Sequence, residues 1–171
     1  MLSFVLRPLR QLVQAMVAND SPRQMAGGFV LGMWMGLLPL GNLAAATIAL
    51  LLFGLRVNKP AGLMAAGVFS LVGFAIDPFA HHVGALVLVW EPARPLHAWF
   101  YNLPLGPWLG LNNTVVVGQL AIGLYLAYPA YWLASQYARR LQPRLENWLK
   151  RSRAVRWLRG AEFSAHWGYD S

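Results

Sequence analysis

The sequence predicts an all-α, polytopic membrane protein, and three observations support this. Of the 171 residues, 57% are hydrophobic and only 12% are charged, whereas a soluble domain carries about 25% charged residues. An uncharged run extends from Met25 to Leu55, which is too long for a helix of a soluble protein. Eight of the 14 Lys and Arg residues lie between Arg139 and Arg159, directly after a hydrophobic segment, as is typical of a juxtamembrane tail.

Residues 1–18 are predicted to form an amphipathic helix that lies in the membrane interface. Apolar side chains recur at helical spacing between Leu2 and Val17, and Arg7 and Arg10 fall on the opposite side. A helix with one apolar and one basic face binds along a membrane surface.

Residues 21–55 form the first hydrophobic segment, which we expect to be broken near its middle. Ser21 and Pro22 are typical of a helix cap and a first helical residue. Pro39 interrupts the run and Asn42 can cap a second helix. We therefore expect a helical hairpin or a re-entrant pair.

Three glycines, Gly28, Gly32 and Gly36, recur every four residues in this segment. They leave one helix face without side chains, so another backbone can approach closely. The approaching helix can belong to this chain or to a partner, and a homo-oligomer also stays open.

Residues 61–90 form a second hydrophobic segment, which follows a short polar turn with Arg56 and Lys59. Asp77 and Pro78 lie near its middle, and Asp77 can cap a helix that restarts at Pro78. The parallel with the first segment indicates a weak internal repeat of two broken helices. Two plain hairpins with tight turns are the alternative.

The remaining elements are predicted from aromatic and basic residues. Residues 91–112 are rich in proline and aromatic side chains, which favours an interfacial loop, and residues 113–134 form the last span. Residues 136–160 are predicted to form a basic amphipathic helix on the membrane. Its expected contacts to anionic lipid headgroups are Arg139, Arg140, Arg144, Lys150 and Arg151. Anionic lipid is a more natural partner than nucleic acid, because basic clusters after spans set topology.

The distribution of charge predicts the orientation of the chain across the membrane. If both termini and the Arg56–Lys59 turn are cytoplasmic and residues 91–112 lie on the opposite side, 13 of the 14 basic residues lie inside. Arg94 alone is then outside, in agreement with the positive-inside rule.

Asp77 and His81 form the candidate intramembrane polar site. They lie one helical turn apart, and such a pair can serve a proton relay or an ion site. The alternative is a structural role, in which Asp77 caps a helix and is neutralised by His81. The chain has no cysteine and no recognisable catalytic motif, so we expect no enzyme activity, metal or cofactor.

The motif S-P-R-Q-M-A-G-G-F-V-L-G-M-W-M-G-L-L-P, followed by N-K-P-A, D-P-F-A-H-H-V-G and N-N-T-V-V-V-G, resembles a family of small uncharacterised bacterial inner-membrane proteins. The resemblance covers Ser21 to about Trp132. A narrower group of about this length is often paired with a much larger envelope protein. The resemblance therefore implies a larger partner and no established activity.

Two hypotheses of function follow. In the first, the chain is a membrane subunit or scaffold of an envelope complex that assists lipid transport between membranes. In the second, it is a small transporter or lipid-flipping protein that uses the broken helices and the Asp77/His81 site.

Overall fold

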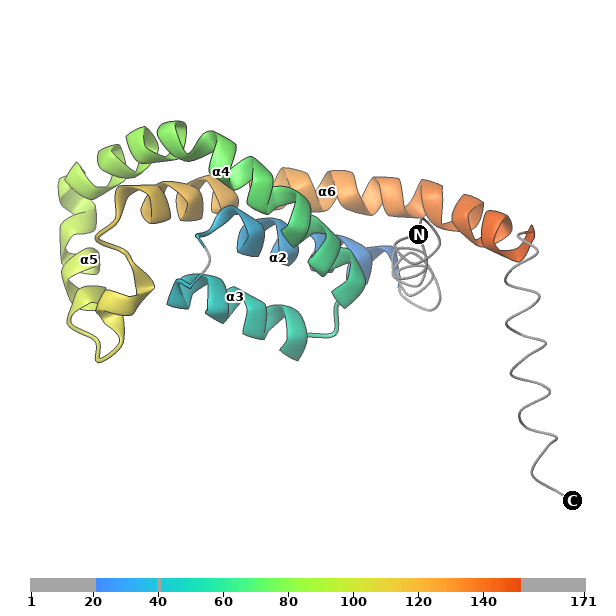
Figure 1. Cartoon of the computed structure of the whole chain (residues 1–171), viewed down its shortest axis with the longest axis horizontal. Coiled ribbons are helices and arrows are strands. Elements are labelled where there is room, and N and C mark those ends of the chain that lie inside the picture. Colours follow the sequence, from blue (N-terminus) through green and yellow to red (C-terminus); the bar gives the residue numbers. More distant parts are fainter. Residues whose placement is uncertain (1–20, 40, 152–171) are drawn as a thin grey trace, which may run out of the picture.

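The computed structural model describes residues 21–39 and 41–151, with side chains up to residue 140 (Figure 1). Within this part the fold is entirely helical. The predicted helix over residues 1–18 and the end of the predicted basic helix, residues 152–160, lie outside the described residues. The elements are α2 (Pro22–Leu37), α3 (Leu43–Gly54), α4 (Lys59–Val89), η1 (Glu91–Ala93), α5 (Arg94–Tyr101), η2 (Gly106–Leu109) and α6 (Thr114–Arg151).

Two of these helices, α4 and α6, are long and apolar enough to cross a membrane. Within their most apolar windows only 22% and 28% of the residues are buried, so most residues of these windows are half-buried or exposed, unlike those of a soluble core helix. In contrast, α2 has 16 residues and α3 has 12, about 24 and 18 Å at 1.5 Å per residue. Both are shorter than a hydrocarbon core of about 30 Å.

The first hydrophobic segment folds into a hairpin of α2 and α3. Ser21 begins α2 in a capping box with Gln24. The amide of Ala44 donates to Oδ1 of Asn42 at 2.7 Å, which caps α3. Between the two helices Gly41 has a φ of +91°, a conformation that residues with a Cβ rarely adopt. The hairpin therefore turns at residues 38–42, where the uncharged run contains Pro39.

The faces of α2 and α4 that carry small residues lie against each other, and the two helices run parallel. The amide of Asn58 donates to the Gln24 carbonyl at 3.0 Å where this contact begins. Further along, a Cβ added to Gly32 would overlap the backbone of Gly62, and one added to Gly36 would overlap that of Ala66. Backbones at this distance require glycine.

A second close contact joins α4 to α6 in the antiparallel sense. A Cβ on Gly84 would overlap the Thr114 carbonyl, and one on Gly118 would overlap the Ala80 carbonyl. As residue numbers fall along α4 they rise along α6. This contact adds α6 to the pair of α2 and α4 and completes a three-helix bundle. The helix that packs on the glycine face of α2 is α4 of the same chain.

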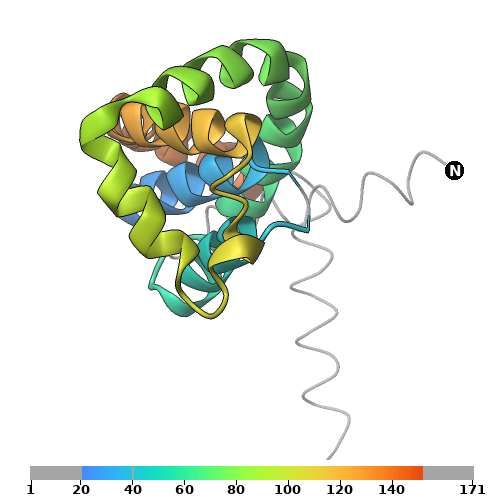
Figure 2. The same cartoon turned by 90° about the vertical axis from the view of Figure 1, so that its left-hand side faces the viewer.

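The predicted restart of a helix at Pro78 is wrong, because α4 is continuous from Lys59 to Val89 with Pro78 inside it. Asp77 is therefore an interior residue and caps nothing. Pro78 cannot donate to the Phe74 carbonyl, and such a site bends a helix without ending it when packing holds both halves. The ribbon of α4 is correspondingly curved (Figures 1 and 2).

Two other predicted boundaries also differ. The last span and the basic helix form one helix, α6, which continues past residue 135 to Arg151; no proline or glycine lies at that point to end it. Residues 91–112 contain η1, α5 and η2. In Figure 1, α5 lies crosswise to α6 at the left-hand end of the bundle. Its Trp99 and Tyr101 are exposed, as suits aromatic residues at headgroup level.

The bundle predicts that Gly32→Leu destabilises the protein strongly, because the new side chain meets the α4 backbone. Overpacking of this kind costs about 1–3 kcal/mol or more. Gly67→Leu is the matched control, since a Cβ at this interior position of α4 has nothing within 4 Å. Thermal unfolding of both purified variants in detergent measures the difference, and equal melting temperatures would contradict the contact.

Candidate functional site

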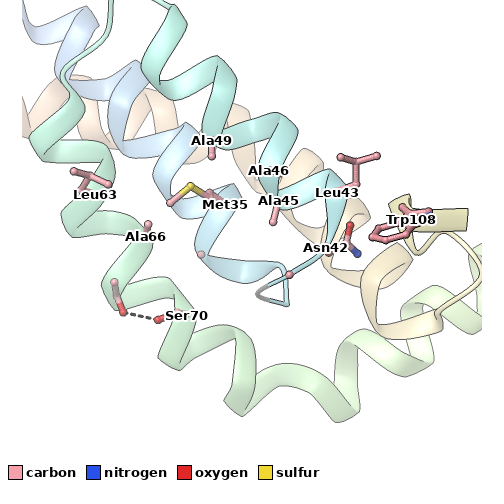
Figure 3. A pocket seen from close by; sticks show the side chains of 13 residues that line it. Met35, Asn42, Leu43, Ala45, Ala46, Ala49, Leu63, Ala66, Ser70 and Trp108 are labelled. Atoms are coloured by element: carbon pink, nitrogen blue, oxygen red, sulfur yellow. Dashed lines mark hydrogen bonds between the residues drawn. The ribbon is translucent and has the colours of Figure 1, made fainter. Parts of the chain in front are cut away.

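A cleft of about 590 Å³ lies between α3 and α4. Its walls consist largely of small residues, and Figure 3 shows them on the facing sides of the two helices, with Met35 of α2 at the base. The small residues are Ala45, Ala46 and Ala49 from α3 and Ala66, Gly67 and Ser70 from α4.

The cleft exists because α3 and α4 pack on different faces of α2. Ala44 and Ile48 of α3 join a buried cluster with Leu38 and with Val116 of α6, whereas α4 covers the glycine face of α2. Nothing lies within 4 Å of a Cβ built on Gly67. Asn42 and Trp108 lie at one end of the cleft (Figure 3).

The polar groups of the cleft are few and locally bonded. The Ser70 hydroxyl donates to the Gly67 carbonyl of its own helix at 2.8 Å, and the Asn42 side chain caps α3. The cleft therefore offers a mostly apolar, small-residue surface to an occupant and no assembled catalytic group.

A polar pair lies between α4 and α6, at the bend near Pro78. Nε2 of Gln119 donates to Oδ1 of Asp77 at 2.7 Å and lies 3.4 Å from the Gly73 carbonyl. Gln119 is 1% exposed and Asp77 is partly buried. Among the described residues, Oε1 of Gln119 has no hydrogen-bond partner.

The predicted pairing of Asp77 with His81 is wrong. Nδ1 of His81 lies 2.6 Å from the Thr114 hydroxyl of α6, and Nδ1 of His82 lies 2.7 Å from the Pro78 carbonyl. In the described part of the chain, the ion pair that forms is between Glu91 and Arg94, whose charged atoms lie 3.5 Å apart. The antiparallel register of α6 places Gln119 and Thr114 opposite Asp77 and His81, so each finds a partner there.

Two buried polar residues, Gln119 and Asn58, are absent from the predictions. Asn58 is fully buried and its Oδ1 accepts from the Ala61 amide at 2.7 Å, which caps α4. The role of each residue was indicated by its sequence context. Asn58 stands two residues before Pro60, a capping arrangement, and Gln119 is an amide inside an apolar span, where polar side chains usually bond between helices.

The starts of α2 and α4 meet at one end of the bundle, since Asn58 bonds to Gln24. The later part of α6 reaches the same end, where Tyr137 and Ala138 line a cavity together with Met25. Arg94 lies at the other end, at the start of α5. The cationic side chains described near the first end are Arg23, Arg56, Lys59, Arg139 and Arg140. Arg144, Lys150 and Arg151 follow along the backbone of α6.

A bacterial family model described as "Uncharacterized protein conserved in bacteria (DUF2062)" matches residues 6–146. The match extends beyond the predicted range on both sides and includes part of the predicted basic helix. An "Uncharacterized protein" of Treponema pallidum (strain Nichols) is 24% identical over 147 residues, which cover 84% of this chain and 91% of the relative. No solved structure matches. The resemblance noted in the sequence is thus confirmed, and the chain belongs to the bacterial family DUF2062.

Proposed function

We propose that this chain is an integral inner-membrane scaffold of a bacterial envelope complex, and that its α3–α4 cleft receives a transmembrane helix of a larger partner. The observation that carries the proposal is the small-residue lining of the cleft. In lipid, helices associate through close packing of small residues, because the hydrophobic effect does not drive helices together there.

The use of the other small-residue faces supports this assignment. Gly32 and Gly36 of α2 are occupied by α4, and Gly84 of α4 is occupied by α6. In the described part of the chain, Ala46 of α3 and Gly67 of α4 both line the cleft, which no helix of the bundle fills. An occupant of the cleft would give α3, which is too short to span alone, a second packing surface.

We expect a photoreactive residue at Ala46 to cross-link a single protein of constant mass in native membranes. Ala75 is the matched control, because it is exposed on α4 and does not line the cleft. A bulkier variant, Ala46→Leu, should lower recovery of the same partner on purification, while Ala75→Leu should not. Lipid adducts alone at both positions would refute a helix-binding cleft.

The same proposal includes the orientation of the bundle across the membrane. Five of the described cations, Arg23, Arg56, Lys59, Arg139 and Arg140, lie near one end of the bundle, which supports a cytoplasmic location for that end by the positive-inside rule. The opposite end, with α5 and η2, is then periplasmic. Cytoplasmic basic residues and a periplasmic aromatic end suit a subunit that assists lipid transport between membranes.

Because the chain has no native cysteine, single cysteines can test this orientation. Leu105→Cys, at an exposed position beside η2, should react with an impermeant thiol reagent in cells whose outer membrane is permeable. Leu55→Cys, exposed next to Arg56, should react only in inverted membrane vesicles. The reverse pattern would overturn the orientation.

A second candidate function is a small transporter or lipid-flipping protein that uses a proton site. The partly buried Asp77–Gln119 pair at the bend of α4 favours it, because a carboxylate inside a membrane helix often marks a transport path. In this version Gln119 takes the place that the sequence suggested for His81.

Asp77→Asn separates the two functions, because an amide keeps a hydrogen bond to Gln119 and cannot titrate. We expect normal folding, and complementation of a deletion strain scored by detergent sensitivity, if the chain is a scaffold. A variant that folds with an unchanged melting temperature yet fails to complement would favour the transporter. Asp77→Leu, which leaves the amide of Gln119 without its main partner, should cost about 1–3 kcal/mol of stability in either case.

A further inference from the structure

A second cavity, of about 580 Å³, lies where α2, α4 and α6 meet. Unlike the α3–α4 cleft, it is lined mainly by large apolar side chains. They include Met25, Phe29 and Met33 from α2, Phe69 from α4, and Leu126 and Leu133 from α6. Three alanines of α6 at four-residue spacing, Ala130, Ala134 and Ala138, also line the cavity. The rings of Phe29 and Phe69 pack edge to face, with centroids 5.9 Å apart. We call this cavity the methionine groove.

The groove has the length and direction of one lipid leaflet. Its lining on α6 extends from Leu126 to Ala138, which is about 18 Å at 1.5 Å per residue. One leaflet is half of a hydrocarbon core of about 30 Å. Since α6 is a candidate membrane span, a groove along it follows the direction of an acyl chain.

The lining combines bulky and small apolar residues. Met side chains adapt to irregular apolar shapes, and Leu and Phe side chains stand beside the alanines of α6. A flexible hydrocarbon chain fits such an uneven apolar surface.

The groove ends at the basic end of the bundle. Arg23 stands two residues before Met25, Lys59 stands two residues before Ala61, and Arg139 follows Ala138 directly. All three cations are exposed, and in the described part of the chain none forms an ion pair. A phosphate at this end would therefore meet cations that are not paired with a carboxylate of the described residues.

We propose that the methionine groove binds one acyl chain of an anionic phospholipid from the leaflet at the basic end, with its phosphate held by Arg23, Lys59, Arg139 and Arg140. The site goes beyond a scaffold function, because it needs no protein partner. The groove lies on a different face from the α3–α4 cleft, so an experiment can refute either proposal without refuting the other.

Native mass spectrometry of the full chain in detergent tests this site. The chain is titrated with phosphatidylglycerol and with phosphatidylethanolamine of the same acyl composition. We expect the anionic lipid to be retained more tightly. In the double variant Arg139→Gln/Arg140→Gln this preference should fall by roughly fivefold per cation removed, while Arg94→Gln at the other end should leave it unchanged.

The acyl chain is tested separately by filling the groove. Ala134→Phe places a ring among the lining residues and should lower retention of both lipids, while Ala75→Phe, exposed and outside the groove, should not. Melting temperatures show whether each variant is folded. If Ala134→Phe unfolds, the experiment with the arginine variants still tests the site. Equal retention of the two lipids by the wild type would overturn the proposal. It would also be overturned if the wild type forms a dimer and Ala134→Phe loses this dimer while its lipid retention is unchanged.

Discussion

The fold depends on backbone-to-backbone contact between helices at small residues. Gly32 of α2 meets Gly62 of α4, and Gly84 of α4 meets Thr114 of α6. In a membrane these contacts replace the hydrophobic burial that stabilises a soluble core, because lipid tails are as apolar as the helices. They also determine direction, since one set of contacts aligns α2 with α4 and the other opposes α4 to α6.

Two cavities with different linings follow from this arrangement. The glycine face of α2 is occupied by α4, so α3 packs elsewhere on α2 and leaves the small-residue cleft beside α4. On the other side, larger residues of α2 and α6 stand apart and form the methionine groove. The cations at one end of the groove distinguish the proposed occupants, a helix in the cleft and an anionic lipid in the groove. A scaffold that holds both would bring a partner protein and a lipid together in one bundle.

The polar groups inside the bundle stabilise places where the helices are weakest. Asn58 caps α4 where it begins beside α2. Gln119 bonds to Asp77 and lies near the Gly73 carbonyl at the bend that Pro78 introduces. A buried polar group without a partner is costly in lipid, so each of these residues has a structural use. Oε1 of Gln119 has no hydrogen-bond partner among the described residues, and a purely structural role does not account for this.

The sequence alone predicts the helical class, the family, the break at Pro39 and Asn42, and the close-packing role of the glycines. These depend on composition and on local backbone chemistry, which act over a few residues. The packing of the helices settles the rest: the first segment folds into a hairpin, α4 continues through Pro78, Asp77 binds Gln119 in place of His81, and α3 stands apart from α4. Each of these outcomes depends on the register between helices distant in the sequence, and a proline or a carboxylate alone does not specify which neighbour will hold it.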